Sequence, residues 1–193
     1  MILFDLGGVL LPFDRERRVR TIAGVTGRAP EAVRDFMASD IHRRLDLGLA
    51  DKADLADAIS DFAGRAIAPH QACALVLSVF EPPNLPLWGL AADLRREFQV
   101  GAFSDNPAMV KQVFPPDAVL DPVFLSCELG ALKPAPEAFK AVEARLDVPA
   151  DAILFIDDTL ANVEQARTMG WDGVAFISND QLNADLAVRG ISA

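Results

Sequence analysis

Short apolar runs alternate along the chain with longer amphipathic segments, and most of the apolar runs end at a polar or acidic residue. The apolar runs have the length and composition of buried strands, and they lie at residues 1–4, 99–103, 123–126, 152–156 and 173–177. Segments with helical spacing lie between them, at residues 87–97, 107–114, 136–146 and 160–169. This alternation predicts an α/β fold in which helices cover both faces of a doubly wound parallel sheet.

Residues 14–84 interrupt the alternation directly after the first predicted strand. Helices are predicted in this region, and no strand pattern appears between them; they lie at residues 15–23, 30–37, 52–62 and 70–80. The proline-rich residues 81–86 then separate this region from the rest of the chain and are typical of a hinge. We therefore expect an α/β core formed by residues 1–13 and 85–193, with an inserted helical cap formed by residues 14–84.

Composition limits the partners and the location. The net charge of −10 argues against a nucleic-acid backbone or an anionic membrane surface as the main partner. The chain has no apolar run of transmembrane length, and its first residues do not form a signal peptide. Cys73 and Cys127 make neither a disulfide framework nor a zinc-binding pattern. These features favour a cytoplasmic protein without a membrane or nucleic-acid partner.

Acidic and polar side chains follow three of the predicted strands. Asp5 follows the first, Ser104 follows the second, and the pair Asp157 and Asp158 follows the fourth. Parallel sheets bind ligands at the carboxyl ends of their strands. If the first and fourth strands are neighbours, the three carboxylates converge and must either repel one another or bind a cation. A set of oxygen donors without His or Cys favours Mg²⁺ as that cation. An aspartate that faces a phosphorus atom there can act as a nucleophile.

Each of these residues also has a purely structural alternative. Asp5 taken alone is equally well explained as a turn-capping residue. The hydroxyl of Ser104 either binds an anion or caps a helix, because Asn106 and Pro107 are typical of a helix start. Lys133, whose conformation is restricted by the following proline, either neutralises a carboxylate and a phosphate or lies solvated in a loop.

In combination, these residues resemble the haloacid dehalogenase-like hydrolase superfamily. The resemblance lies in the motifs FDLGGVLLPFD (4–14), AFSDN (102–106), SCELGALKPAPEAF (126–139) and ILFIDDTLANVEQARTMGW (153–171). The chain is most similar to the branch with a small helical cap, which includes sugar-phosphate phosphatases. The resemblance implies a Rossmann-like core with strand order 5-4-1-2-3. It also implies a Mg²⁺-dependent phosphatase that acts on a small phosphorylated metabolite through an aspartyl-phosphate.

The resemblance further implies a role for each matching residue. Asp5 would be the nucleophile, and Lys133 would pair with both Asp5 and the phosphate. Asn162 would support Lys133 or the water around the metal. The expected metal ligands are Asp5, the main-chain carbonyl of Gly7, Asp157 and Asp158. The residues expected around the phosphoryl group are Gly7, Gly8, Ser104, Asp105, Asn106 and Lys133.

Two positions depart from the family pattern. Gly7 stands where most of these phosphatases carry a second aspartate, the general acid and base, a group that contributes about 10²–10⁴-fold to the rate. Asp14, at the mouth of the cap, either replaces that acid or caps the helix that begins at Arg15. Asp105 stands where asparagine is usual, and we expect it to cap a helix at Pro107. These departures predict weak turnover.

Other functions stay open at this point. Gly7 and Asp105 are also compatible with a catalytically degenerate phosphate-binding or regulatory protein. A haloacid dehalogenase uses the same nucleophile without a metal, but such relatives lack the acidic pair at 157–158. The cap arginines either hold a distal anion of the substrate or form a solvated helix face, and His42 has no assigned role. These arginines are Arg15, Arg17, Arg18, Arg20, Arg43 and Arg44.

Overall fold

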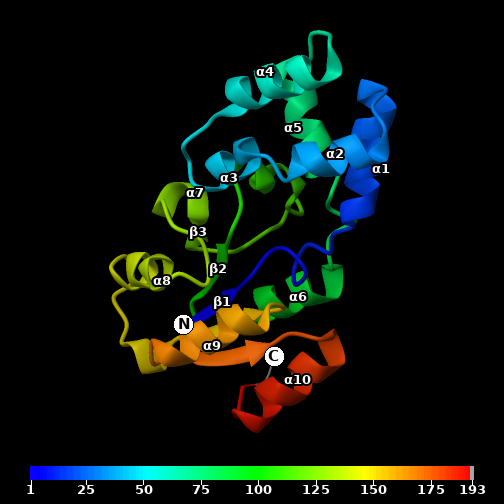
Figure 1. Cartoon of the computed structure of the whole chain (residues 1–193). Coiled ribbons are helices and arrows are strands. Elements are labelled where there is room, and N and C mark those ends of the chain that lie inside the picture. The colour runs from blue at the N-terminus through cyan, green and yellow to red at the C-terminus, as the bar shows by residue number, and fades with distance from the viewer. Residues whose placement is uncertain (192–193) are drawn as a thin grey trace.

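A five-stranded parallel sheet forms the centre of the computed structural model, which describes residues 1–191 (Figure 1). Its strands are β1 (Ile2–Phe4), β2 (Val100–Ser104), β3 (Val123–Leu125), β4 (Leu154–Asp157) and β5 (Asp172–Ala175). Their order is β3-β2-β1-β4-β5, and every neighbouring pair is parallel. This is the predicted order 5-4-1-2-3 counted from the opposite edge. The predicted fold class is therefore confirmed, with β1 and β4 as neighbours.

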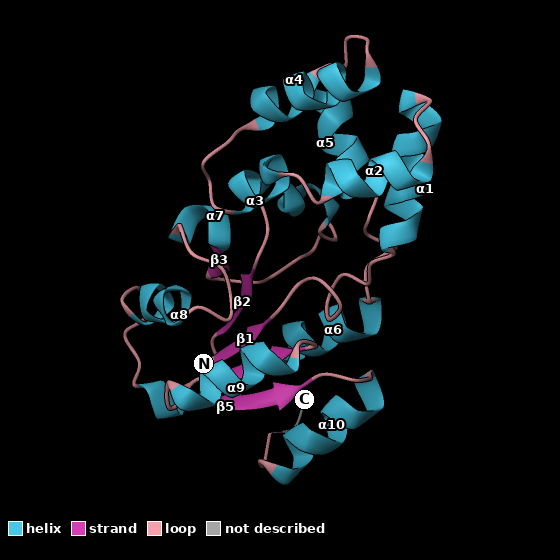
Figure 2. Cartoon of the chain, viewed as in Figure 1, coloured by secondary structure: helices cyan, strands magenta, loops and turns pink. Residues whose placement is uncertain are grey.

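Side chains that alternate along the strands give the sheet two apolar faces. In β1, Ile2 and Phe4 belong to one buried cluster and Leu3 belongs to another. The first cluster includes residues of α6 (Leu85–Leu94) and α10 (Asn179–Val188), and the second includes residues of α8 (Pro136–Glu143) and α9 (Leu160–Thr168). Figure 2 shows the strands enclosed between helices, as expected for a doubly wound sheet.

Five further helices gather at one end of the molecule around a third buried cluster (Figure 1). They are α1 (Arg15–Thr26), α2 (Pro30–Met37), α3 (Asp40–Asp46), α4 (Lys52–Ala63) and α5 (Pro69–Leu77). Two chain segments run side by side where these helices join the sheet. The N–H of Asp14 donates to the carbonyl of Val79, and the N–H of Glu81 donates to the carbonyl of Pro12, at 2.8 Å each. The separate cluster supports the division into a core and a cap, which stays a prediction.

Several elements differ from the predicted segments. Helices α3, α10 and α7 (Ser126–Leu129) were not expected, and α3 has seven residues, too few for a helical period to be evident. Residues 107–114 contain a 3₁₀ helix (Ala108–Val113) rather than an α-helix. It ends before Phe114, because Pro115 disfavours helical geometry at the residue that precedes it. A second 3₁₀ turn (Ala150–Ala152) precedes β4. No helix within residues 1–191 combines the length and the apolar character needed to cross a membrane.

Candidate active site

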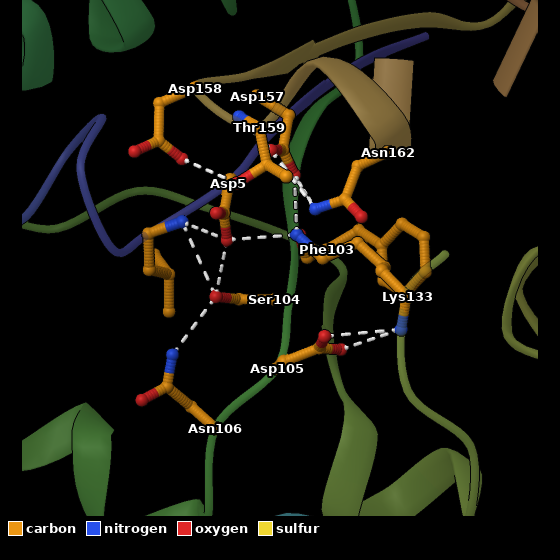
Figure 3. A network of polar contacts seen from close by, with 11 residues as sticks. Asp5, Phe103, Ser104, Asp105, Asn106, Lys133, Asp157, Asp158, Thr159 and Asn162 are labelled. Atoms are coloured by element: carbon orange, nitrogen blue, oxygen red, sulfur yellow. Dashed lines mark hydrogen bonds and ion pairs between the residues drawn. The ribbon is translucent and has the colours of Figure 1, made fainter. Parts of the chain in front are cut away.

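The carboxyl ends of three neighbouring strands bring the predicted site residues together (Figure 3). Phe4 of β1 pairs with Ala102 of β2 and with Ile156 of β4, so the residues that follow them meet at one edge of the sheet. A cavity of about 190 Å³ opens there. Its walls are Asp5, Gly7, Phe13, Arg15, Ser104, Asp105, Asn106, Lys133, Asp158, Thr159 and Asn162.

The Asp5 carboxylate is buried and uses one oxygen to contact the protein. Oδ1 accepts hydrogen bonds from the N–H of Leu6 at 2.7 Å and from the hydroxyl of Ser104, and it lies 3.1 Å from Nζ of Lys133. Within the described part of the chain, Oδ2 has no hydrogen-bond partner. The side chain is therefore fixed through one oxygen while the other is left for a ligand.

Ser104 is part of the site rather than a helix cap. Its hydroxyl donates to Asp5 and accepts a hydrogen bond from Nδ2 of Asn106 at 3.0 Å. The following 3₁₀ helix has no side-chain cap. Ser104 and Asn106 thus form a short chain of hydrogen bonds that ends on the buried carboxylate.

Lys133 is buried between carboxylates from two strand ends. Its Nζ lies 2.6 Å from Oδ2 of Asp157, 3.1 Å from Oδ1 of Asp5 and 3.1 Å from the carbonyl of Phe103. Such a buried ammonium neutralises charge that would otherwise be strongly unfavourable in this position. The alternative of a solvated loop lysine is therefore wrong.

Asp105 fixes the backbone of Lys133. Both of its carboxylate oxygens accept from the N–H of Lys133, at 3.1 Å each (Figure 3). The prediction that Asp105 caps a helix at Pro107 is wrong, because the carboxylate turns instead to a backbone N–H that lies 28 residues further along the chain. Asp105 therefore positions the lysine on which the charge balance of the site depends.

The protonation of the central pair follows from burial and charge. Burial raises the pKa of the Asp5 carboxyl to about 7, and the positive charge of Lys133 acts in the opposite direction. Burial alone would lower the pKa of Lys133, but the carboxylates of Asp5, Asp157 and Asp105 raise it above its ordinary value. Lys133 is therefore charged, and a divalent cation beside Asp5 would favour the ionised carboxylate.

The two acidic residues after β4 differ in their surroundings. Asp157 is fully buried and, besides Lys133, it accepts from the N–H of Thr159 at 2.7 Å and from Nδ2 of Asn162 at 3.0 Å. Asp158 is exposed, and its one hydrogen bond within the described residues is a 3.4 Å contact with the hydroxyl of Thr159. Asp158 is thus available to a ligand, whereas most of the acceptor capacity of Asp157 is already used.

This donor set fits a divalent cation. Asp5, Asp157 and Asp158 each offer one carboxylate oxygen, and these oxygens lie within 4.8 Å of one another. The Asp158 carboxylate lies against Gly8 and occupies the space that a Cβ at position 8 would need. Oxygen donors of this kind suit a hard cation such as Mg²⁺. The predicted ligands Asp5, Asp157 and Asp158 therefore meet at one point, with Gly7 in the adjoining loop.

Asp14 lies outside this cluster. Its carboxylate caps α1 by accepting from the N–H of Arg17 at 3.0 Å, and it forms an ion pair with Arg20 at 3.1 Å. The hydrogen bond from the Arg17 backbone lowers the pKa of Asp14 below its ordinary value, which makes this carboxyl a poor proton donor. The structure therefore favours the helix-capping alternative for Asp14.

A second cavity, of about 240 Å³, contains residues that sequence reasoning did not assign. Arg18 of α1 and His42 and Asp46 of α3 line it, together with Asp105, which follows β2. His42 and Asp46 belong to α3, a helix that the sequence pattern did not predict. The sequence shows that charged residues cluster in this part of the chain, which was the one available sign of a binding site. It did not indicate which of these residues face the cavity.

The fold and the site define a doubly wound α/β protein with an aspartate cluster at the carboxyl edge of its parallel sheet. Residues 1–170 match the model of the haloacid dehalogenase-like hydrolases, and the chain belongs to this family.

Similar proteins agree with this assignment. A D-ribitol-5-phosphate phosphatase from Bacteroides thetaiotaomicron is 24% identical over 182 residues, which cover 89% of this chain and 88% of that protein. A HAD family enzyme from the same organism, solved in complex with magnesium and inorganic phosphate, has a TM-score of 0.82 at 23% identity and covers 94% of this chain and 97% of that chain. A HAD-like family hydrolase from Porphyromonas gingivalis has a TM-score of 0.85 at 21% identity, over 100% of this chain and 98% of that chain. At these identities the two structures show a shared fold.

Proposed function

We propose that this protein is a Mg²⁺-dependent phosphatase that hydrolyses a small phosphoric monoester through an aspartyl-phosphate at Asp5. The observation that carries the proposal is the Asp5 carboxylate, held through Oδ1 with Oδ2 left available beside Lys133. The acidic pair at 157–158, within 4.8 Å of it, supports the need for a cation. The phosphatase relative and the magnesium–phosphate complex of a structural neighbour support the same chemistry.

The metal would be held by Asp5, Asp158 and the main-chain carbonyl of Gly7, with Asp157 acting directly or through water. When bound, Mg²⁺ would supply positive charge that offsets the charges of the phosphoryl oxygens and of Asp5. Asp157 is the weakest candidate for direct contact, because it already accepts hydrogen bonds from Lys133, Thr159 and Asn162.

In the first half-reaction, Oδ2 of Asp5 attacks the phosphorus atom. A bond forms between this oxygen and phosphorus, and the bond from phosphorus to the leaving-group oxygen breaks. The side chain of Asn106 lies where it can donate to a phosphoryl oxygen. The hydroxyl of Ser104 can do the same once it releases its hydrogen bond to Asp5. Lys133 keeps a positive charge next to Asp5 and offsets the negative charge of the transferred group.

In the second half-reaction, water attacks the phosphorus atom of the aspartyl-phosphate. Inorganic phosphate leaves, and the Asp5 carboxylate is restored. Gly7 supplies no side chain to protonate the leaving-group oxygen or to take a proton from the attacking water, so solvent donates the first proton and accepts the second. We therefore propose slow turnover, with good leaving groups preferred.

The alternative functions have less support. A phosphate-binding protein without turnover was suggested by Gly7 and Asp105, but Asp105 is occupied with the backbone of Lys133. A dehalogenase would not need the acidic pair, whose oxygens gather around Asp5. Gly7 is then the one feature that still favours a binding protein.

Phosphate release from a panel of phosphorylated metabolites and from p-nitrophenyl phosphate tests the proposal. We expect release with Mg²⁺, none with EDTA, and a loss of at least about 10³-fold in Asp5→Asn. Asp57→Asn is the matched control, because Asp57 is exposed on α4. A blank panel at high enzyme concentration would refute the proposal. Mg²⁺-dependent phosphate binding in calorimetry would then identify a binding protein, and metal-independent chloride release from a haloacid would identify a dehalogenase.

A further inference from the structure

The cavity between the cap and the core continues the space in front of Asp5. It measures about 240 Å³, below the range of about 300–1,000 Å³ that holds drug-sized ligands. Five residues line both this cavity and the one that contains Asp5, namely Gly7, Phe13, Arg15, Asp105 and Asn106. A phosphoryl group beside Asp5 would therefore place the rest of a small substrate in the second cavity.

Two buried nitrogen atoms on the wall of this cavity lack hydrogen-bond partners. They are Nε of Arg18 and Nε2 of His42. Among the buried side-chain nitrogen and oxygen atoms of residues 1–191, these two lack a hydrogen-bond partner. Buried polar atoms in folded proteins nearly always have a partner. That both exceptions lie on one cavity indicates a ligand with polar atoms at this place.

The cavity wall carries groups of both charges. Arg15 and Arg18 face the carboxyl groups of Asp46 and Asp105, and burial raises the pKa of both carboxyls, that of Asp46 to about 7. His42 is held neutral, since burial and the charge of Arg18 lower its pKa to about 4. A second phosphate or a carboxylate on the substrate would meet two carboxyl groups as well as two guanidinium groups. Hydroxyl groups fit better, because each can accept a hydrogen bond from Arg18 or His42 and donate one to Asp46.

The part of the cap that carries His42 and Asp46 is held against the core. The main-chain carbonyl of Asp46 accepts a hydrogen bond from the hydroxyl of Ser126, the first residue of α7. Two residues further on, Gly48 (φ 70°) approaches the main chain of Cys127 so closely that a Cβ at this position would overlap with it. These contacts fix the distance between the cap wall and Asp105 across the cavity.

We propose that Arg18, His42 and Asp46 select the leaving group of the substrate, and that this group is a short, uncharged chain bearing several hydroxyls, such as a sugar or a polyol. The proposal rests on the proposed phosphatase function. It assigns the specificity of the reaction to three cap residues that contact the part of the substrate remote from phosphorus.

The test compares kcat/KM for three substrates in the presence of Mg²⁺. D-Ribitol 5-phosphate offers hydroxyls, 2-phosphoglycolate offers a carboxylate, and p-nitrophenyl phosphate offers neither. We expect the unchanged protein to prefer ribitol 5-phosphate over 2-phosphoglycolate. In Arg18→Met, the ratio of kcat/KM for ribitol 5-phosphate to that for p-nitrophenyl phosphate should fall about 10- to 100-fold. Arg43→Met is the matched control, because Arg43 is exposed on α3 next to His42.

Each outcome bears on a different statement. An unchanged ratio in Arg18→Met, with hydrolysis retained, overturns the specificity assignment. A preference for 2-phosphoglycolate that is lost in Arg18→Met overturns the hydroxylated leaving group and identifies an anion site. Absence of hydrolysis of all three substrates by the unchanged protein refutes the proposed function itself. If circular dichroism shows that Arg18→Met does not fold, Arg18→Lys decides, since it keeps the charge and the aliphatic stem but lacks the Nε–H.

Discussion

Gly8 lies directly beneath the carboxylate of Asp158. Its φ of 78° is in the left-handed region that favours glycine, and a Cβ built on it would overlap with Oδ2 of Asp158. The exposed carboxylate of the acidic pair can therefore approach Asp5 only because position 8 has no side chain. Position 8 thus shapes the carboxylate cluster without donating a ligand atom of its own side chain to it.

Substitution of Gly8 by alanine should damage metal binding more than folding. The new methyl displaces Asp158, and we expect the affinity for Mg²⁺ to fall about 10- to 100-fold in calorimetry. Left-handed strain adds about 1–2 kcal/mol of destabilisation, measured by urea unfolding in EDTA. Gly7→Ala is the comparison, since a Cβ there meets only the ring of Phe13 at 3.7 Å, and it should lose far less affinity. Equal losses in both variants would contradict this account.

The sheet and the central carboxylates were predictable because their signals are local. Most strands are apolar runs that end at a polar residue, and parallel strands bring such ends to one edge. Asp5, Ser104 and Asp157 could therefore be placed together once β1, β2 and β4 were adjacent. Similarity to the family motifs supplied the strand order that made this adjacency definite.

The remaining features depend on partners that are distant in the sequence. Asp105 bonds to the backbone of Lys133, 28 residues away, and Ser126 holds the main chain of Asp46, 80 residues away. Neither contact produces a periodic pattern in the sequence, so neither could be predicted from it. The inward orientation of Arg18 and His42 likewise follows from how short helices pack, which charge and spacing alone do not specify.

Removal of the Lys133 charge should destabilise the protein strongly. Lys133→Met leaves the fully buried Asp157 and the buried Asp5 without their shared ammonium. Breaking a buried ion pair on one side typically costs about 3–5 kcal/mol, and we expect a decrease of that size in the free energy of unfolding by urea in EDTA. Lys140→Met, on the exposed side of α8, is the control. A change below about 1 kcal/mol would mean that the ion pair is not formed in solution.

Introduction of an acid at position 7 should increase the turnover of poor substrates. Gly7 lines both cavities, and a Cβ there has only van der Waals contact with Phe13, so a carboxyl group can be accommodated where the leaving group passes. We expect Gly7→Asp to raise kcat for an alkyl phosphate, by up to about 10²–10⁴-fold, and to raise it much less for p-nitrophenyl phosphate. Gly7→Asn has the same shape without a transferable proton and should show no gain. An equal or lower rate in Gly7→Asp would argue against a missing general acid.

The stability of the cap should depend on pH through His42. This ring packs edge-on against Phe36, with centroids 5.6 Å apart, and burial followed by the charge of Arg18 lowers its pKa from 6.5 to about 4. At pH values between these two pKa values, His42 binds a proton in the unfolded chain but not in the native protein. The free energy of unfolding is therefore undiminished above about pH 6.5 and decreases as the pH falls towards 4. One pKa unit corresponds to about 1.4 kcal/mol, so the full effect of this histidine is about 3 kcal/mol.

Urea unfolding at pH 7.5 and at pH 4.5 measures this effect. We expect the unchanged protein to lose about 2–3 kcal/mol more between these pH values than His42→Gln, which has no titrating group at this position. His70→Gln is the matched control, because the side chain of the one other histidine is exposed at the start of α5. If the unchanged protein and His42→Gln lose the same amount, His42 takes up its proton in the native state, and the neutral ring assigned to the wall of the substrate cavity is wrong.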